Sequence, residues 1–335
     1  MKFMAESCIM VKDTVCDGGM KMLEGFRSPL SATAYEKCVD AGYEFLGLVT
    51  PFEYGIDNLF DADSSTDEVI EAVKSGKCDF ALCRDVFGRI VRAAAENGLV
   101  FAEGAYGTVS RFGLMQAVSS TDRVGVLCRD ADTAAKVLSV ISGHDEKDGS
   151  MLYEKEYSYT ADFDGEVKVV TAENADMKYI KTLEAVYYCL ASAEICNNTN
   201  RYDGVKFGHR AENINGVNDL YVKSRSEGFG KDMKIASIVG CMVLAQGNYE
   251  KWYYKAMQIR RLAAEYYTKM LTDADVLVLP TECDLVDKFG QMRLYVLAKL
   301  CGFASVTATY NGRPSQIIAR RGNENAMFKV AKEGK

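Results

Sequence analysis

The segment DRVGVLCRDADTAAKVLSVISG, residues 122–143, joins two patterns that together indicate the fold class. Residues 124–127 form a short apolar run that contains β-branched side chains, as in a buried strand. After a polar turn, residues 132–141 place apolar side chains at the three-to-four spacing of a helix. A strand followed by an amphipathic helix is typical of α/β proteins.

The same alternation extends along the chain in both directions. Strand-like runs occur at 43–49, 80–82, 166–170, 276–279, 304–308 and 315–319. Helical spacing occurs at 32–41, 67–75, 90–96, 178–193, 232–244 and, as one long helix, 249–271. We therefore expect an α/β sheet that is buried on both faces by helices. We interpret the aromatic stripe of 249–271 as core rather than as a cofactor site.

Composition excludes several classes of protein. The chain has 335 residues, a formal net charge of −7 and 48% hydrophobic residues, so it should fold, and no direct binding to nucleic acid is expected. The longest apolar stretches are shorter than the roughly 20 residues that span a bilayer. We read no secretion signal at the N-terminus. We expect a soluble, cytoplasmic protein without a membrane segment.

Cysteine and histidine usage gives no metal or cofactor site. The eleven Cys residues are irregularly spaced and form no CxxC pair, so we expect thiols of a reducing cytosol rather than disulfides or a zinc site. The two His residues, His144 and His209, do not suggest a Ser-His-Asp triad. Common nucleotide, zinc-protease and α/β-hydrolase motifs are absent. We expect no metal and no cofactor.

Lysine chemistry is the remaining signal. The run IMVKDTV, residues 9–15, places Lys12 among apolar residues in a strand-like context. A buried lysine has a lowered pKa and can act as a base. The residues alone favour the alternative, a lysine at a strand end with its ammonium group in water.

Four longer segments carry a family resemblance. They are SRFGLMQAVSSTDRVGVLCRDADTAAKVLSVISGHDEKDGS (110–150), RYDGVKFGHRAE (201–212), LYVKSRSEGFG (220–230) and DADVLVLPTE (273–282). In this order they resemble the amidase signature family, and within it the A subunits of bacterial glutamyl-tRNA(Gln) amidotransferases. The resemblance implies one domain over residues 1–335, with a twisted mixed sheet covered by helices on both faces and without the family's N-terminal helices.

The resemblance also implies a chemistry. The family uses a serine nucleophile, a bridging serine with a cis peptide, a lysine, and glycine-rich backbone NH groups as an oxyanion hole. Lys12 matches the family lysine through IMVKD. An ungapped count back from YGTVSRFGL, residues 106–114, places the nucleophile on Arg89 and the bridging serine on Ser65. An arginine stays protonated and cannot attack a carbonyl, so the nucleophile position is expected to be lost.

The residues around these positions also differ from the family pattern. Gly88 remains, but the other expected glycines are replaced by Asp67, Glu68, Val86 and Phe87. The oxyanion hole is therefore expected to be lost as well. Ser65 also fits a capping box at the start of a helix, and we favour that interpretation over a catalytic role.

Two residues match the family's substrate pocket. Arg225 in SRSEGFG matches the arginine that holds a substrate carboxylate, and Tyr202 in RYDGV matches a pocket tyrosine. A structural salt bridge is an equal alternative for Arg225. The family's acidic residue for the substrate amino group falls near Phe289, which would remove that contact.

These observations predict a divergent, catalytically defective relative of the amidotransferase A subunit. Its scaffold would bind a protein partner, with the B and C amidotransferase subunits as candidates, or a small amide or amino acid. The alternative is an active amidase or a glutamine-hydrolysing subunit that supplies ammonia for tRNA-dependent transamidation. That enzyme would need another nucleophile, for which Ser64, Ser65 and Thr66 are the candidates in this region. A truncated product with no stable role is a third interpretation.

Overall fold

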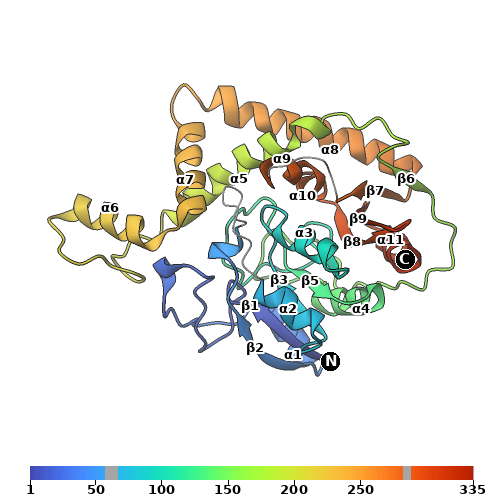
Figure 1. The fold of residues 1–335 in the computed structure, drawn as a ribbon, viewed down its shortest axis with the longest axis horizontal. Helices are drawn as coiled ribbons and strands as arrows, with labels where there is room; N and C mark the ends of the chain where they lie inside the picture. The colour runs from blue at the N-terminus through green and yellow to red at the C-terminus, as the bar shows by residue number, and fades with distance from the viewer. Residues whose placement is uncertain (57–66, 282–287, 335) are drawn as a thin grey trace.

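A mixed β-sheet runs through the molecule (Figure 1). The computed structural model describes residues 1–56, 67–281 and 288–334. Within them nine strands pair in the order β2-β1-β3-β5-β4-β8-β9-β7-β6. The strands are β1 (Lys2–Glu6), β2 (Glu44–Val49), β3 (Phe80–Cys83), β4 (Val100–Glu103), β5 (Gly125–Cys128), β6 (Val169–Thr171), β7 (Val276–Pro280), β8 (Ala304–Tyr310) and β9 (Arg313–Ala319). β1 is parallel to β2 and β3, β6 is parallel to β7, and the other pairs are antiparallel.

Helices surround the sheet and form a separate layer at one side of it. They are α1 (Thr33–Asp40), α2 (Glu68–Lys74), α3 (Arg89–Glu96), α4 (Ala131–Ile141), α5 (Leu183–Thr199), α6 (Val217–Gly228), α7 (Lys231–Leu244), α8 (Lys255–Asp273), α9 (Lys288–Gln291), α10 (Val296–Cys301) and α11 (Glu324–Glu333). A 3₁₀ turn, η2 (Glu53–Gly55), follows β2, and a π turn, η4 (Glu250–Tyr254), leads into α8. Helix α5 contacts α7, α8 and α10, α8 also contacts α10, and α6 extends away from the body (Figure 1).

Side-chain alternation in the strands gives the sheet two buried faces. In β3, Phe80 and Leu82 belong to the larger core, which also contains residues of α1, α4 and α11. Ala81 and Cys83 belong to a second core, which contains residues of α2 and α3. Because successive side chains of a strand point to opposite faces, the two sets of helices cover opposite sides of the sheet. The expected fold class, an α/β mixed sheet with helices on both faces, is confirmed.

Several local predictions were wrong. Residues 9–15 do not form a strand; the N-terminal strand is β1, whose polar residues obscured the pattern. The N-cap of α2 is Asp67, whose side chain accepts a hydrogen bond from the Val69 NH, and Ser65 lies outside the described residues. In the long helix, Trp252, Met257 and Leu262 are 39–48% exposed, so the aromatic stripe is only partly core. The buried face of α8 is formed by Ala256, Ala263, Tyr267 and Leu271.

None of the helices in the described part of the chain combines the length and the apolar character that crossing a bilayer requires.

Candidate functional site

The turn between β3 and α3 positions the residue that the sequence matched to the family nucleophile. Gly88 is the N-cap of α3 and has φ +89°, in the left-handed region that favours glycine. A Cβ atom at this position would lie 2.3 Å from Cδ2 of Tyr295. Glycine is therefore required both by the backbone conformation and by the close approach of Tyr295. It places Arg89 at the first residue of α3.

Arg89 is buried and ion-paired. Its side chain is 2% exposed and contacts the carboxylates of Glu6, the last residue of β1, and Asp67, the N-cap of α2. Its guanidinium also lies over the Phe52 ring, 5.6 Å from the centroid. A cation at a helix N-terminus is unfavourable because of the helix dipole, so the two carboxylates are needed to offset both the dipole and burial.

The charges of Glu6 and Asp67 keep the Arg89 guanidinium charged. Burial alone would lower the pKa of Arg89, but the charges of Glu6 and Asp67 outweigh it and raise the pKa above its ordinary value. Burial raises the pKa of Glu6, and the Arg89 charge offsets part of that rise. The second Glu6 oxygen, Oε2, accepts a 2.8 Å hydrogen bond from the Arg84 backbone NH. Glu6 is thus held by two arginines.

The thiols near this cluster are poor nucleophiles. Cys8 Sγ lies 4.0 Å from Glu6 Oε2, and Cys83 ends β3. Burial raises the pKa of Cys8 to about 12 and that of Cys83 well above its ordinary value. Since the thiolate is the nucleophilic form, neither residue supplies a replacement for a serine nucleophile at neutral pH.

A second buried ionic cluster lies on the other side of the same turn. Lys299 of α10 donates to both Glu103 carboxylate oxygens, at 2.9 and 3.0 Å, and its Nζ is 3.5 Å from Asp85 Oδ2. Asp85 Oδ1 also accepts a hydrogen bond from the Ile90 NH in the first turn of α3, at 3.1 Å. Arg123 also belongs to this cluster, because its Nη2 lies 3.4 Å from Glu103 Oε2. The charges of this cluster are therefore used in holding α3 and α10 together.

Tyr202 and Arg225 lie next to each other. Arg225 Nη1 donates to the backbone carbonyls of Thr199 and Tyr202, both at 2.9 Å, and its guanidinium lies 4.7 Å from the Phe229 ring centroid. Burial lowers the pKa of Arg225. The expected carboxylate-binding arginine is thus engaged with backbone carbonyls, and the alternative of a salt bridge is not what the structure shows.

A chain of contacts connects this pair to Arg89. The hydroxyls of Tyr202 and Tyr54 are 3.4 Å apart. Arg84 lies over the Tyr54 ring, 4.7 Å from the centroid, and its backbone NH donates to Glu6, the partner of Arg89. The structure therefore brings Arg89, Tyr202 and Arg225 into one connected set of residues.

The other predicted residues lie elsewhere. Lys12 is in a turn after β1, with an exposed side chain, and its backbone NH donates to Ser31 Oγ at 3.1 Å. The desolvated environment that a lysine base needs is not present there. Ser65, with Ser64 and Thr66, lies outside the described residues. Phe289 packs edge-on against Tyr188, with ring centroids 5.2 Å apart.

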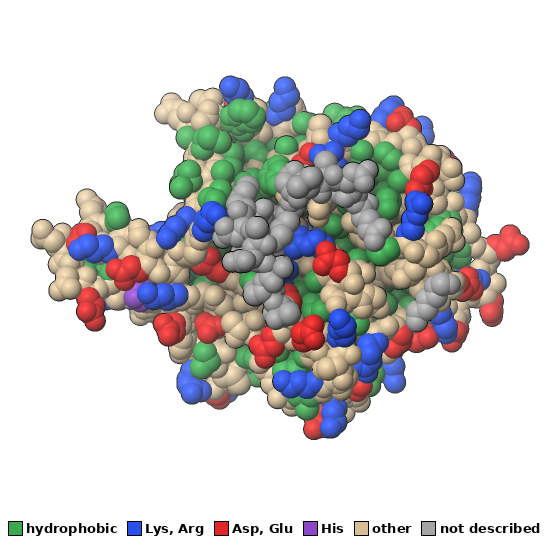
Figure 2. Space-filling model, in the orientation of Figure 1, with side chains coloured by type: hydrophobic (Ala, Val, Ile, Leu, Met, Phe, Trp, Pro, Cys, Tyr) green, Lys and Arg blue, Asp and Glu red, His purple; other side chains and the backbone are tan. Residues whose placement is uncertain are grey.

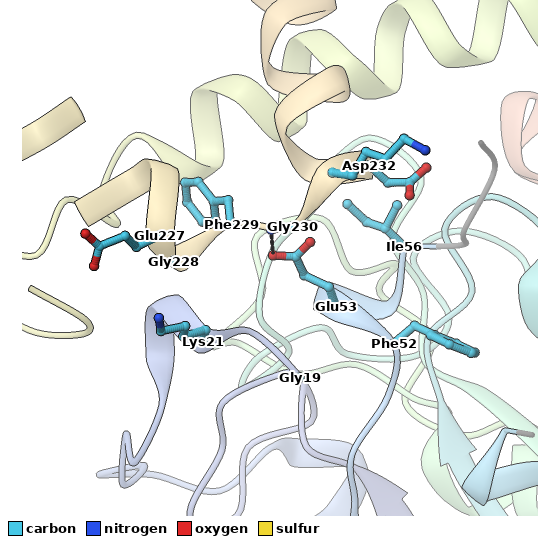
Figure 3. A pocket seen from close by; sticks show the side chains of 11 residues that line it. Gly19, Lys21, Phe52, Glu53, Ile56, Glu227, Gly228, Phe229, Gly230 and Asp232 are labelled. Atoms are coloured by element: carbon cyan, nitrogen blue, oxygen red, sulfur yellow. Dashed lines mark hydrogen bonds between the residues drawn. The ribbon is translucent and has the colours of Figure 1, made fainter. Parts of the chain in front are cut away.

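A pocket of about 390 Å³ opens beside this set (Figure 3). It lies between η2 and the segment that joins α6 to α7. Glu53 Oε1 accepts a 2.6 Å hydrogen bond from the Gly230 NH across the pocket. Burial raises the pKa of Glu53. Phe52 lines the pocket and its ring also lies against the Arg89 guanidinium, so one residue separates the pocket from the buried arginine.

Three kinds of comparison place this architecture among known proteins. The Amidase family model matches residues 71–170 and 165–320. The chain belongs to the amidase family. It is similar to the glutamyl-tRNA(Gln) amidotransferase A subunit of Enterococcus faecalis, with 29% identity over 96% of this chain and 79% of that protein. The corresponding protein of Lactobacillus johnsonii is 30% identical over 96% of this chain and 82% of its own length.

Solved structures share the fold. The crystal structure of the glutamyl-tRNA(Gln) amidotransferase A subunit from Thermotoga maritima has a TM-score of 0.74 at 22% identity and covers 99% of this chain and 82% of that chain. A chain from a vestigial protein complex related to the origins of an s-triazine catabolic enzyme has a TM-score of 0.79 at 16% identity, over 99% of this chain and 82% of that one. These likenesses confirm the expected fold.

Sequence reasoning missed the charged partners of Arg89. Glu6 was not identified, because the lysine strand was assigned to residues 9–15. Asp67 was noted only as a lost glycine. Lys299, inside the apolar stretch YVLAKLCGF, could have been found as a lone charge in an apolar run. In the described ranges, which omit 57–66, 282–287 and 335, no three His, Cys, Asp or Glu side chains are grouped to hold a metal ion.

Proposed function

We propose that this chain is an amidase-family protein that does not hydrolyse amides and that uses its scaffold for binding. The observation that carries the proposal is Arg89, which matches the family nucleophile in sequence and is buried between Glu6 and Asp67. A permanently charged guanidinium cannot form an acyl intermediate. The side chains that surround it satisfy its charge and leave no thiolate beside it.

The position of the base supports the same proposal. β1, rather than residues 9–15, is the strand that pairs with β3, and it ends in Glu6. We infer that Glu6 stands where the family's lysine strand presents its lysine. The Glu6 carboxylate accepts bonds from Arg89 and Arg84, so it is a structural partner of the arginine rather than a free base.

The pocket supports a small ligand. Its walls combine Phe52, Ile56 and Phe229 with the carboxylates of Glu53 and Asp232, as expected for a compact molecule with both apolar and polar groups (Figure 3). We propose a small amide or amino acid as the ligand. Because Arg225 Nη1 already donates to the Thr199 and Tyr202 carbonyls, a ligand carboxylate would bind this residue through its other donors, Nε and Nη2.

Exposed apolar side chains support a protein partner. Val222 of α6 and Ile238 of α7 are 65% and 69% exposed, and Trp252 and Tyr254 precede α8 with 45% and 50% exposure. Figure 2 shows hydrophobic side chains gathered over α7 and the start of α8. Apolar surface of this kind is typical of protein interaction sites. Because the relatives are named as A subunits, we propose the B and C amidotransferase subunits as the partners.

We also propose that residues 1–335 form one domain around the single sheet.

The alternative is an active amidase or glutamine-hydrolysing subunit that supplies ammonia for tRNA-dependent transamidation. It is favoured by the 30% identity that extends over 82% of an amidotransferase A subunit. It requires a nucleophile other than residue 89, for which Ser64, Ser65 and Thr66 are the candidates.

The two functions are separated by ammonia release. The purified protein is incubated with glutamine or with a simple amide, with and without B and C subunits, and ammonia is measured against a bacterial glutaminase as positive control. We expect no release above background in either setting, and no change in Lys12→Ala. Release that disappears in Ser65→Ala would overturn the proposal and assign the nucleophile. Isothermal titration with glutamine and pull-down with the B and C subunits then test the two binding roles separately.

A further inference from the structure

Two cysteines face each other across the contact between α5 and α7. The Sγ atoms of Cys196 and Cys241 are 3.3 Å apart. Cys196 is buried in α5, whereas Cys241 is exposed on α7. A disulfide bond has an S–S length of about 2.05 Å, so the two sulfurs need to approach by only a little more than about 1 Å to form one. A dissolved oxidant can reach Cys241 directly.

The closeness of the sulfurs is built into the helix packing. A Cβ atom at Gly240 would lie 2.2 Å from the Ser192 carbonyl oxygen and 2.5 Å from Cys196 Cβ. The backbone of α7 therefore lies directly against α5 at the residue that precedes Cys241. Small residues at a helix crossing allow such an approach, and it holds Cys241 beside Cys196 without any rearrangement of the fold.

Arg225 lies close enough to interact electrostatically with both sulfurs. Burial raises the pKa of Cys196 to about 11, the neighbouring Cys241 adds to the rise, and Arg225 opposes it. When Cys241 is bonded to the oxidant, it no longer opposes ionisation of Cys196. The positive charge of Arg225 then favours ionisation of the buried partner, which is the form that attacks a disulfide.

We propose that Cys196 and Cys241 are a redox-sensitive modification site that closes to an intramolecular disulfide on reaction with a low-molecular-weight disulfide such as oxidised glutathione. The Cys241 thiolate attacks one sulfur of the oxidant, whose S–S bond breaks and releases one thiol. The Cys196 thiolate then attacks the Cys241 sulfur and releases the second thiol. The two protons lost by the cysteines are taken up by the two released thiols, so one disulfide is reduced as one is formed.

The cross-link would enclose the segment that carries the candidate binding residues. Cys196 and Cys241 are 45 positions apart, and the chain between them includes Tyr202, α6 with Arg225, and Glu227 to Asp232 at the pocket. α6 extends away from the body of the molecule, and α7 connects it back to the helical layer (Figure 1). A covalent bond between α5 and α7 would hold both ends of this segment together and oppose its local opening.

The test is equilibration of the folded protein in oxidised and reduced glutathione, followed by acid quenching, alkylation of free thiols and peptide mass mapping. We expect a Cys196–Cys241 cross-linked peptide with the loss of two hydrogen atoms, reversed by dithiothreitol. Trypsin should also cut residues 201–231 more slowly in the oxidised protein. Cys189→Ser, which changes a half-buried thiol on the same helix as Cys196, is the matched control and should form the same cross-link.

Two results would overturn the proposal. One is a stable adduct in which Cys241 carries glutathione while Cys196 remains alkylatable. The other is a dimer linked through Cys241 of two molecules, seen on a non-reducing gel and absent in Cys241→Ser. Because Cys241 is exposed, Cys241→Ser should fold. As an independent check, trypsin should cut residues 201–231 of this variant equally fast under oxidising and reducing conditions.

Discussion

Replacing Arg89 by methionine would test whether this residue stabilises the fold where β1, α2 and α3 meet. The change keeps an unbranched side chain but removes the charge that faces Glu6 and Asp67. Both Arg89 and Glu6 are almost completely buried, with side-chain exposures of 2% and 0%. Breaking a buried ion pair on one side costs about 3–5 kcal/mol, because the remaining charge has no partner. This is a large share of the roughly 5–15 kcal/mol by which a typical domain is stable.

The assay is urea unfolding followed by circular dichroism, with the parent and Arg89→Met compared at pH 8 and pH 5. Without Arg89 the pKa of Glu6 rises further above its ordinary value than in the parent. A raised carboxyl pKa in the folded state means that stability is present at low pH and lost as pH rises through that pKa. The destabilisation by Arg89→Met should therefore be smaller at pH 5 than at pH 8.

Two further variants sharpen this experiment. Glu6→Gln in the Arg89→Met background removes the more deeply buried of the two unpaired charges and should recover about 1–3 kcal/mol of the loss, as expected for residues in direct contact. Arg261→Met removes an exposed pair with Glu265, whose side chains are 81% and 59% exposed, and should leave stability nearly unchanged. If Arg89→Met is as stable as Arg261→Met at both pH values, the structural role assigned to Arg89 is wrong.

The remaining predictions concern the turn before Arg89 and a partly buried carboxylate, Asp148. Gly88→Ala should lower the free energy of unfolding by about 3 kcal/mol in the same urea assay, because it combines a left-handed backbone with a contact against Tyr295. Gly98→Ala, with φ +64° but nothing within 4 Å of the new Cβ, should lower it by only about 1 kcal/mol. Equal losses would contradict the role given to Tyr295. Burial alone would raise the pKa of Asp148, but hydrogen bonds from Arg111 and Ser150 outweigh it and lower the pKa from 3.8 to about 2. The contribution of Asp148 to stability is thus present above pH 3.8 and lost as pH falls towards 2. Asp148→Asn should therefore cost about 1–2 kcal/mol at pH 7, after discounting for partial solvent exposure. In acid unfolding, the difference in stability between this variant and the parent should shrink between pH 3.8 and 2.

The fold could be predicted from sequence where local patterns agree with burial. The run at 124–127 and the helical spacing at 132–141 appear as β5 and α4 with shifts of at most one residue at each end. Strands whose sequence carries polar residues were not found: β1 begins with Lys2 and ends with Glu6, and β4 ends with Glu103. Both glutamates are buried because arginine or lysine partners from distant segments meet them, and no local pattern records such a partner.

The candidate site was predicted only in part, because the partners of its residues also come from distant segments. The ungapped count predicts that Arg89 occupies the nucleophile position, and the structure describes the environment of this residue. Lys12 was misleading because a lysine in an apolar run resembles a buried base, whereas a turn places it at the surface. The role of Arg225 depends on carbonyl groups of Thr199 and Tyr202, which any sequence could supply, so backbone geometry alone decides it.

The three-way contact of Arg89 with Glu6 and Asp67 also bears on how this protein could change over generations. A mutation of Arg89 to serine would leave two carboxylates without a partner, and a mutation of Glu6 to lysine would place two cations against each other at a buried position. Each single step towards a serine and lysine pair therefore passes through a less stable protein. The three charges therefore constrain one another: replacing any one of them alone leaves a buried charge unbalanced, so we expect the cluster to change only by several substitutions together.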